Sequence, residues 1–188
     1  VGILLVTHWG VSGPATLKLS SYAARFLHEH HYHCPISINW TGETNQQKVA
    51  EDLLHQQHLH PQKQMSTTKV FELPTRVWHY LLQRSTLNPD TRWCDLSKKA
   101  LRKLVEVLTN DGYLVAGKGT FKEEFVTCGG VSLQSIHANT LESKVIPGLY
   151  FAGEILDVDG ITGGFNLQAA WTTGYIAGKS VASTFGRE

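Results

Sequence analysis

The sequence has few charged residues, few cysteines and no long apolar run. Charged residues make up 18% of 188 positions, and 17 basic against 16 acidic side chains leave a net charge of +1. This balance excludes a strongly basic nucleic-acid domain, a polyacidic protein and most disordered chains. No run of 18 apolar residues is present, so we expect no spanning helix and no membrane partner. No basic and apolar leader follows Val1, so we expect no secretory signal.

Cysteine is also scarce. Cys34, Cys94 and Cys128 are widely spaced and form no CxxC pair. Reduced thiols in a cytoplasmic protein are the simplest interpretation. Four histidines within residues 28–33 lie beside Cys34 and resemble a metal site. No second ligand pair has a fixed spacing, so we predict a solvated helix end and no metal.

Glycine is nearly missing from the middle of the chain. Ten of the 17 glycines fall in 129–188 and three in 1–13, whereas only Gly42 lies between 14 and 111. The two ends are therefore suited to tight turns and close backbone approach, and the middle to helices.

The hydrophobic spacing predicts a chain that mixes helices and strands. Ser12 is expected to cap the first helix, and Ser97 is expected to cap a later one. Val49, Leu53 and Leu54 are expected to point inward from a helix over 45–60. The expected strands are 1–8, 35–40, 113–117, 121–127 and 149–152, and the expected helices are 14–28, 45–60, 74–84, 97–110 and 165–184.

The chemistry is concentrated in 127–178. A predicted buried strand ends at Gly153-Glu154, and Gly163-Gly164 precede a helix. Glycines before a helix let backbone N–H groups face a ligand, and the helix dipole favours phosphate or an electron-rich carbonyl there. An acidic residue at a strand end is typical of sites that bind a ribose-like hydroxyl. The alternative is that the glycines only make turns and that Glu154 is a solvated acid.

Three segments resemble one known family. They are TCGGV at 127–131, PGLYFAGEILDVDGITGGFNLQAAWTTG at 147–174 and THWGVSGPATLKLS at 7–20. They are similar to BaiN-type flavoproteins, bacterial NAD(P)/FAD-dependent oxidoreductases that include aminoacetone oxidase. The resemblance implies an α+β fold in which 1–125 is an inserted domain with a small β-barrel and a helical part at about 45–110. Residues 126–188 would be the C-terminal strand–helix part of an FAD-binding Rossmann-like domain.

The resemblance also implies a cofactor site. Glu154 would hydrogen-bond the ribityl chain of FAD, and Gly153 would allow close approach. Backbone groups at the helix start would face the flavin ring or the pyrophosphate, and Asp157 and Asp159 are candidates in the same loop. The predicted cofactor-binding residues are Thr127, Cys128, Gly129, Gly153, Glu154, Asp157, Gly163, Gly164, Phe165 and Asn166.

The sequence departs from the family in one respect: no G-x-G-x-x-G follows a strand. We therefore expect a fragment of an FAD-dependent oxidoreductase, with an incomplete FAD site and no assignable catalytic acid or base. Its expected partners are the FAD domain of the same parent chain and a small-molecule substrate. NAD(P)H is a candidate electron donor, and exposed apolar surface makes self-association an open option.

Other interpretations stay open beside this one. A non-catalytic module could recognise a protein partner through its helical and barrel parts. Cys128 is either a reactive thiol near the flavin or a packing residue, and His8 is a candidate to contact flavin or substrate. A basic helix face is expected to be solvated rather than to bind nucleic acid, and it comprises Lys98, Lys99, Arg102 and Lys103.

Overall fold

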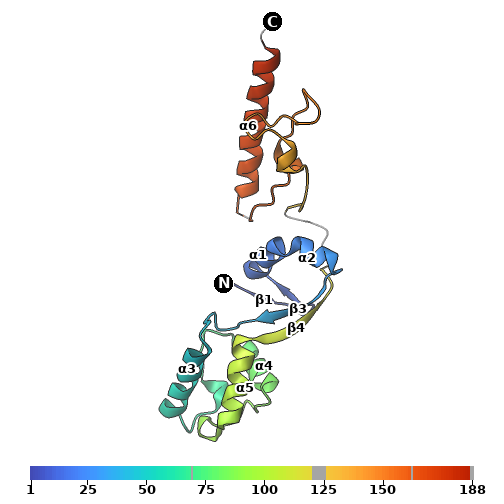
Figure 1. Cartoon of the computed structure of the whole chain (residues 1–188). Helices are drawn as coiled ribbons and strands as arrows, with labels where there is room; N and C mark the ends of the chain where they lie inside the picture. Colours follow the sequence, from blue (N-terminus) through green and yellow to red (C-terminus); the bar gives the residue numbers. More distant parts are fainter. Residues whose placement is uncertain (69, 120–125, 162, 187–188) are drawn as a thin grey trace. The chain divides into compact units, whose positions relative to one another are not determined.

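The computed structural model describes residues 1–68, 70–119, 126–161 and 163–186. This part of the chain has a mixed α/β fold with six α-helices and two small antiparallel sheets, which confirms the predicted mixture (Figure 1). The elements are β1 (Leu5–Val6), β2 (Val11–Ser12), α1 (Pro14–Tyr22), α2 (Ala24–Glu29), β3 (His33–Ile38), α3 (Gln46–Leu59), α4 (Thr75–Arg84), α5 (Lys98–Thr109), β4 (Asp111–Ala116) and α6 (Phe165–Phe185).

The chain divides into two compact units. One is His33–Ala116, and the other combines Val1–Tyr32 with Gly117–Glu188. No closed barrel is found among the residues described, because each sheet has only two strands. The predicted division at residue 125 and the inserted-domain arrangement stay predictions. Within the described ranges, no helix is long and apolar enough to cross a membrane.

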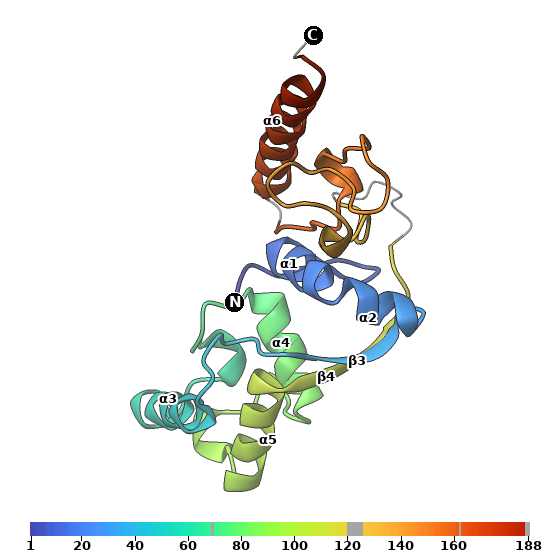
Figure 2. The ribbon, with the colours of Figure 1, turned by 45° about the horizontal axis from the view of Figure 1, so that its top comes forward.

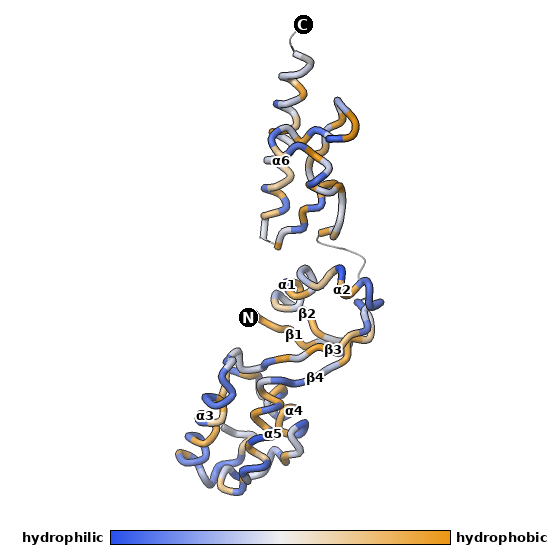
Figure 3. The backbone as a smooth tube through the Cα atoms, viewed as in Figure 1, coloured by the Kyte–Doolittle hydropathy of each residue, from blue (hydrophilic) through white to orange (hydrophobic). Residues whose placement is uncertain are grey.

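The His33–Ala116 unit is built on α3, α4 and α5, which both ribbon views show gathered beside the β3–β4 ladder (Figure 2). Hydrophobic and hydrophilic residues alternate along α3 (Figure 3). As predicted, the Ser97 side chain caps α5, accepting a hydrogen bond from the Ala100 N–H. The prediction for Leu54 is wrong: its side chain is 37% exposed, since α3 buries only the face that carries Val49 and Leu53. The core residues are Val49, Leu53, Met65, Trp78, Leu81, Leu82, Trp93, Leu96, Leu104, Val105, Val107 and Leu108.

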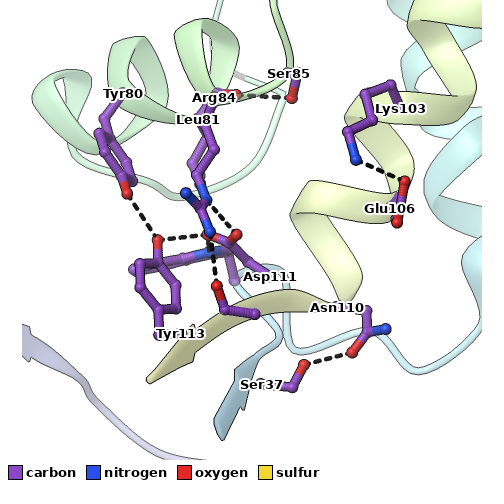
Figure 4. A network of polar contacts seen from close by, with 12 residues as sticks. Ser37, Tyr80, Leu81, Arg84, Ser85, Lys103, Glu106, Asn110, Asp111 and Tyr113 are labelled. Carbon is purple, nitrogen blue, oxygen red and sulfur yellow. Dashed lines mark hydrogen bonds and ion pairs between the residues drawn. The ribbon is translucent and has the colours of Figure 1, made fainter. Parts of the chain in front are cut away.

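A buried carboxylate joins α4 to β4 in this unit (Figure 4). The Asp111 side chain is 3% exposed and forms an ion pair with Arg84. It also accepts hydrogen bonds from the Trp40 indole N–H, at 3.1 Å, and from the Tyr113 hydroxyl. Arg84 donates a further hydrogen bond to the Gly112 carbonyl, at 2.7 Å. A buried charge needs such partners, because an unpaired one is costly in a medium of low dielectric constant.

This network makes stability depend on pH. Burial raises the pKa of Tyr113 above its ordinary value of 10.0, and the hydrogen bond to Asp111 raises the pKa further. The folded state therefore keeps the phenol proton at pH values where the unfolded chain has lost it. We expect the free energy of unfolding to be unaffected by this group below pH 10 and to fall as the pH rises above it. Urea titrations across that pH should show a smaller fall for Tyr113→Phe, and an equal fall would contradict the assignment.

The N-terminal segment of the other unit is less buried than predicted. β1 and β2 pair antiparallel over two residues each, and Ile3 and Leu5 are 76% and 55% exposed, so the predicted buried strand at 1–8 is wrong. Too few residues pair there to form a covered sheet. The predicted cap by Ser12 is also wrong, because Ser12 lies in β2 and the residue before α1 is Gly13, at φ +90°. The predicted helix over 14–28 forms as α1 and α2, which part at Ala23.

The chain between residues 131 and 158 packs along α6, as both ribbon views show (Figure 1, Figure 2). A small core holds it there, centred on Ile136, Leu141, Leu156 and Ala177. The predicted strand over 149–152 is wrong: Tyr150 forms a single bridge to Glu142, and a short 3-10 helix, η4 (Gly153–Ile155), follows. Among the described residues the pairing does not continue past that bridge. The predicted strand over 121–127 lies mostly outside the described residues.

Candidate cofactor-binding site

The segment Thr127–Val131 lies beside the segment that follows Glu154. Val131 and Leu156 form a parallel bridge, with hydrogen bonds from the Val131 N–H to the Ile155 carbonyl, at 2.8 Å, and from the Asp157 N–H to the Val131 carbonyl, at 3.0 Å. Gly130 makes this approach possible: a Cβ built there would lie 2.5 Å from the Ile155 carbonyl oxygen. Parallel pairing of segments 25 residues apart is typical of α/β folds, in which a crossover joins neighbouring strands.

Glu154 stands at an exposed turn that α6 holds in place. Gly153 has φ +78°, and its N–H donates to the Thr173 hydroxyl of α6, at 2.9 Å. One carboxylate oxygen of Glu154 accepts a hydrogen bond from the Thr127 N–H, at 3.3 Å. The structure therefore brings together Thr127, Gly153 and Glu154, and among the described residues the second oxygen of Glu154 makes no hydrogen bond.

The start of α6 is open. Gly164 precedes the helix at φ +94° and Gly163 has φ +128°; among the described residues no side chain caps the helix, and its first turn holds no acid. A Cβ at Gly164 would find nothing within 4 Å. The first N–H groups of a helix have no partner inside it, and the helix dipole adds about half a positive charge at that end. Phe165 is 62% exposed at this point.

The side chain of Asn166 binds the backbone of Gly160. Its amide oxygen accepts from the Gly160 N–H, at 2.7 Å, and its amide nitrogen donates to the Gly160 carbonyl, at 3.0 Å. These two bonds fasten the loop after Asp157 to the first turn of α6. Asn166 thus positions the loop through its side chain, while its backbone N–H stays at the open helix start.

Asp157 forms an ion pair, and its predicted role in cofactor binding stays a prediction. Arg25 of α2 donates from one nitrogen to both carboxylate oxygens, at 2.8 and 3.0 Å. This hydrogen bond raises the pKa of the Arg25 guanidinium above its ordinary value, and the neighbouring Cys128 thiol raises it further. In the part of the chain that is described, Asp159 makes no side-chain hydrogen bond, and His8 is exposed in the turn between β1 and β2.

Sequence reasoning missed three residues that build this site. Arg25 and Thr173 lie on helices whose apolar spacing gave no reason to single them out. Gly160 was visible as a glycine, but the sequence does not show that its backbone binds the Asn166 side chain. Gly130 belongs to the TCGGV segment noted above, but the sequence does not show that it approaches the Ile155 carbonyl. The sequence did offer one signal for Thr173. It is a polar residue four positions before Ala177, so it lies on the same face of α6 as that core residue.

Two other candidate features remain apart from this site. No group of three or more His, Cys, Asp and Glu side chains is placed to hold a metal ion among the residues described. On α5, Lys103 pairs with Glu106 at 2.9 Å, and within the described ranges Lys98, Lys99 and Arg102 have no ion-pair partner.

The family follows from a comparison of sequences. Residues 18–180 match the family model described as HI0933-like protein Rossmann domain. The match covers most of the chain, so this chain belongs to the HI0933-like family, a flavoprotein family that includes the BaiN-type proteins. The resemblance noted from the motifs is thereby confirmed at the level of the family.

Three curated relatives are similar over almost the whole chain. The ribosomal RNA dihydrouridine synthases of Escherichia coli (strain K12) and Haemophilus influenzae are 31% and 30% identical, over 95% of this chain and 42% of each relative. The 3-dehydro-bile acid delta(4,6)-reductase of Clostridium scindens is 29% identical, over 96% of this chain and 44% of that protein. The chain therefore spans less than half the length of these relatives.

Proposed function

We propose that this chain supplies the flavin-facing part of an FAD site in a longer FAD-dependent reductase. Membership of a flavoprotein family supports the cofactor class. No G-x-G-x-x-G follows a strand here, so the unit that binds the ADP half of FAD would come from the rest of the parent protein. The chain alone is then expected to hold little or no FAD.

The residues present fit the flavin end of such a cofactor. The observation that carries the proposal is the open start of α6: among the described residues it has no side-chain cap, its first turn holds no acid, and there is space beside Gly164. Asn166 and Gly160 fix the loop that links this helix start to the turn at Glu154. A rigid frame of this kind suits a ligand with both hydroxyl groups and an electron-rich carbonyl.

The mechanism assigns binding and electrostatic roles to this chain. When bound, FAD supplies hydride transfer, which side chains cannot perform. The Glu154 carboxylate would hold the cofactor by accepting hydrogen bonds from ribityl hydroxyls. The first N–H groups of α6, at Phe165 to Leu167, would donate to the carbonyl side of the ring system and favour negative charge there, with the helix dipole adding to the effect. Gly153, held by Thr173, keeps Glu154 in position.

The names of the relatives favour reduction of a double bond. A dihydrouridine synthase and a delta(4,6)-reductase both add hydrogen to an unsaturated substrate. We infer the same reaction type for the parent of this chain, with NAD(P)H as electron donor. The near-zero net charge supports a small molecule as the substrate.

Ribosomal RNA is a second candidate substrate. The observation that favours it is the exposed group formed by Lys98, Lys99 and Arg102 on α5, whose charges are not neutralised by ion pairs among the described residues. Unpaired cations on one helix can contact phosphates. Measuring dihydrouridine in ribosomal RNA from cells lacking the gene decides between the two: a loss of one modified base selects RNA, and an unchanged level selects the small molecule.

Glu154 provides the test of the cofactor site. In the full-length protein, Glu154→Ala should weaken FAD binding about 10- to 100-fold, since a hydrogen bond to a charged group contributes roughly 1.5–3 kcal/mol. Fluorescence titration of the apoprotein with FAD measures the effect. Glu51→Ala, which removes an exposed acid from α3, is the matched control and should leave the affinity unchanged. Equal affinities in all three proteins would remove the assigned role of Glu154.

A further inference from the structure

One face of α6 is apolar and uncovered. Leu167, Trp171 and Tyr175 follow at intervals of four residues, which places them on one side of the helix. They are 65%, 72% and 71% exposed. Gly174 and Gly178 lie on the same side, and these five residues are called the α6 stripe. The neighbouring side of the helix faces the small core of its own unit through Ala177.

The glycines of the stripe have no explanation within this chain. Glycine is the least favourable helix residue after proline, so two of them inside a helix destabilise it. A Cβ at Gly174 or at Gly178 would find nothing within 4 Å. Alanine would therefore fit both positions without a clash. Small residues in a helix face are useful where another backbone approaches closely, and in the described part of the chain none does.

The total exposed area of the chain also indicates that a partner covers part of its surface. The chain exposes 13152 Å². Two separate compact bodies with the sizes of its two units would expose only about 11,000 Å² together. The difference, roughly 2,000 Å², is more than the roughly 800 Å² that one partner contributes to a standard interface. Exposed Trp and Tyr side chains are the residues that most often anchor such interfaces.

We propose that the α6 stripe is the surface on which the rest of the Rossmann domain packs, contributed by the same parent polypeptide. The identity of the partner rests on the proposed function, and the existence of the interface does not. The family model is that of a Rossmann domain, whose helices cover a parallel sheet of several strands. Beside α6 this chain offers one parallel bridge, Val131 with Leu156, and its relatives are more than twice as long. A backbone from that missing layer lies against Gly174 and Gly178, and Trp171 and Tyr175 lie together along one side of it.

Cysteine labelling tests this interface. Tyr175→Cys places a thiol in the stripe, and Ser183→Cys places one on the flank of α6, where it is also exposed. Each is introduced into the 188-residue chain and into the full-length gene product, and maleimide labelling is followed by peptide mass spectrometry. In the full-length protein, the thiol at position 175 should react at least roughly tenfold more slowly than in the chain alone, because burial limits reaction to transient opening. The thiol at position 183 should react equally in both.

The outcomes separate this proposal from its alternatives. Equal labelling of position 175 in both proteins would overturn it, and so would protection in the 188-residue chain that grows with protein concentration, since a second copy would then cover the stripe. Protection in the full-length protein without bound flavin would support the interface and contradict the proposed function. Gly174→Ala gives a second measurement: it should raise the melting temperature of the chain alone and lower that of the full-length protein. A rise in both would contradict close packing at Gly174.

Discussion

Gly130→Ala is expected to open the contact between 129–131 and 155–157. The new Cβ would lie 2.5 Å from the Ile155 carbonyl oxygen, 2.7 Å from the Leu156 carbonyl carbon and 2.9 Å from the Asp157 nitrogen. All three are backbone atoms, so no side-chain rotation can relieve the clash. Overpacking and a left-handed backbone at φ +148° together cost about 2–6 kcal/mol. Amide hydrogen exchange should show faster exchange at Val131 and Asp157.

Gly129→Ala is the matched control. Gly129 also has a positive φ, +106°, but a Cβ there would find nothing within 4 Å. This variant bears only the backbone cost, about 1–3 kcal/mol. The difference between the two variants therefore measures the close approach at Gly130. If both alanines change the exchange of Val131 and Asp157 equally, the parallel pairing has been wrongly assigned.

Arg84→Ala is expected to destabilise the His33–Ala116 unit. The change leaves the buried Asp111 carboxylate without its cation, although Trp40 and Tyr113 still donate to it. We expect a loss of about 2 kcal/mol, less than for a fully buried pair because solvent reaches the Arg84 side chain. For a unit of this size, that corresponds to a fall in melting temperature of roughly 8–16 °C. Circular dichroism during heating and urea unfolding measures both quantities.

Lys103→Ala tests whether any broken ion pair would have the same effect. Lys103 and Glu106 are 48% and 60% exposed on α5, so their pair contributes at most about 0.5 kcal/mol. A loss of stability as large as that of Arg84→Ala would show that burial of Asp111 is not what makes the Arg84 pair strong.

The sequence predicted the helical elements well because their signals are local. Helices α3 and α5 begin after Asn45 and Ser97, whose side chains cap them, and both carry regular apolar spacing. The helix from Phe165 follows two glycines and was also predicted. These features depend on residues only a few positions apart, which a single sequence shows directly.

The strands at the two ends were mispredicted for a physical reason. Apolar runs such as 1–8 and 149–152 have strand composition, but a strand also needs neighbours to pair with. In the described residues, the first run pairs over only two positions and the second forms one bridge. Covered sheets at these places require pairing partners beyond those that this chain shows.

The site itself stays a prediction, and the contacts that support it were not predicted. Glu154 and the glycines before α6 belong to motifs that the sequence displays. The contacts of Arg25 with Asp157 and of Thr173 with Gly153 join residues 132 and 20 positions apart. Such contacts follow from tertiary packing, so no local pattern reveals them. The pairing of Asp157 with Arg25 was therefore not predicted, and the cofactor-binding role of Asp157 stays a prediction.

Flavin content tests the central claim most directly. The full-length gene product and the 188-residue chain are purified in parallel, incubated with FAD, and freed of unbound cofactor by gel filtration. We expect the full-length protein to retain about one FAD per chain, visible in its absorbance spectrum, and the 188-residue chain to retain little or none. A full-length protein that neither carries flavin nor can be reconstituted with FAD would contradict the account.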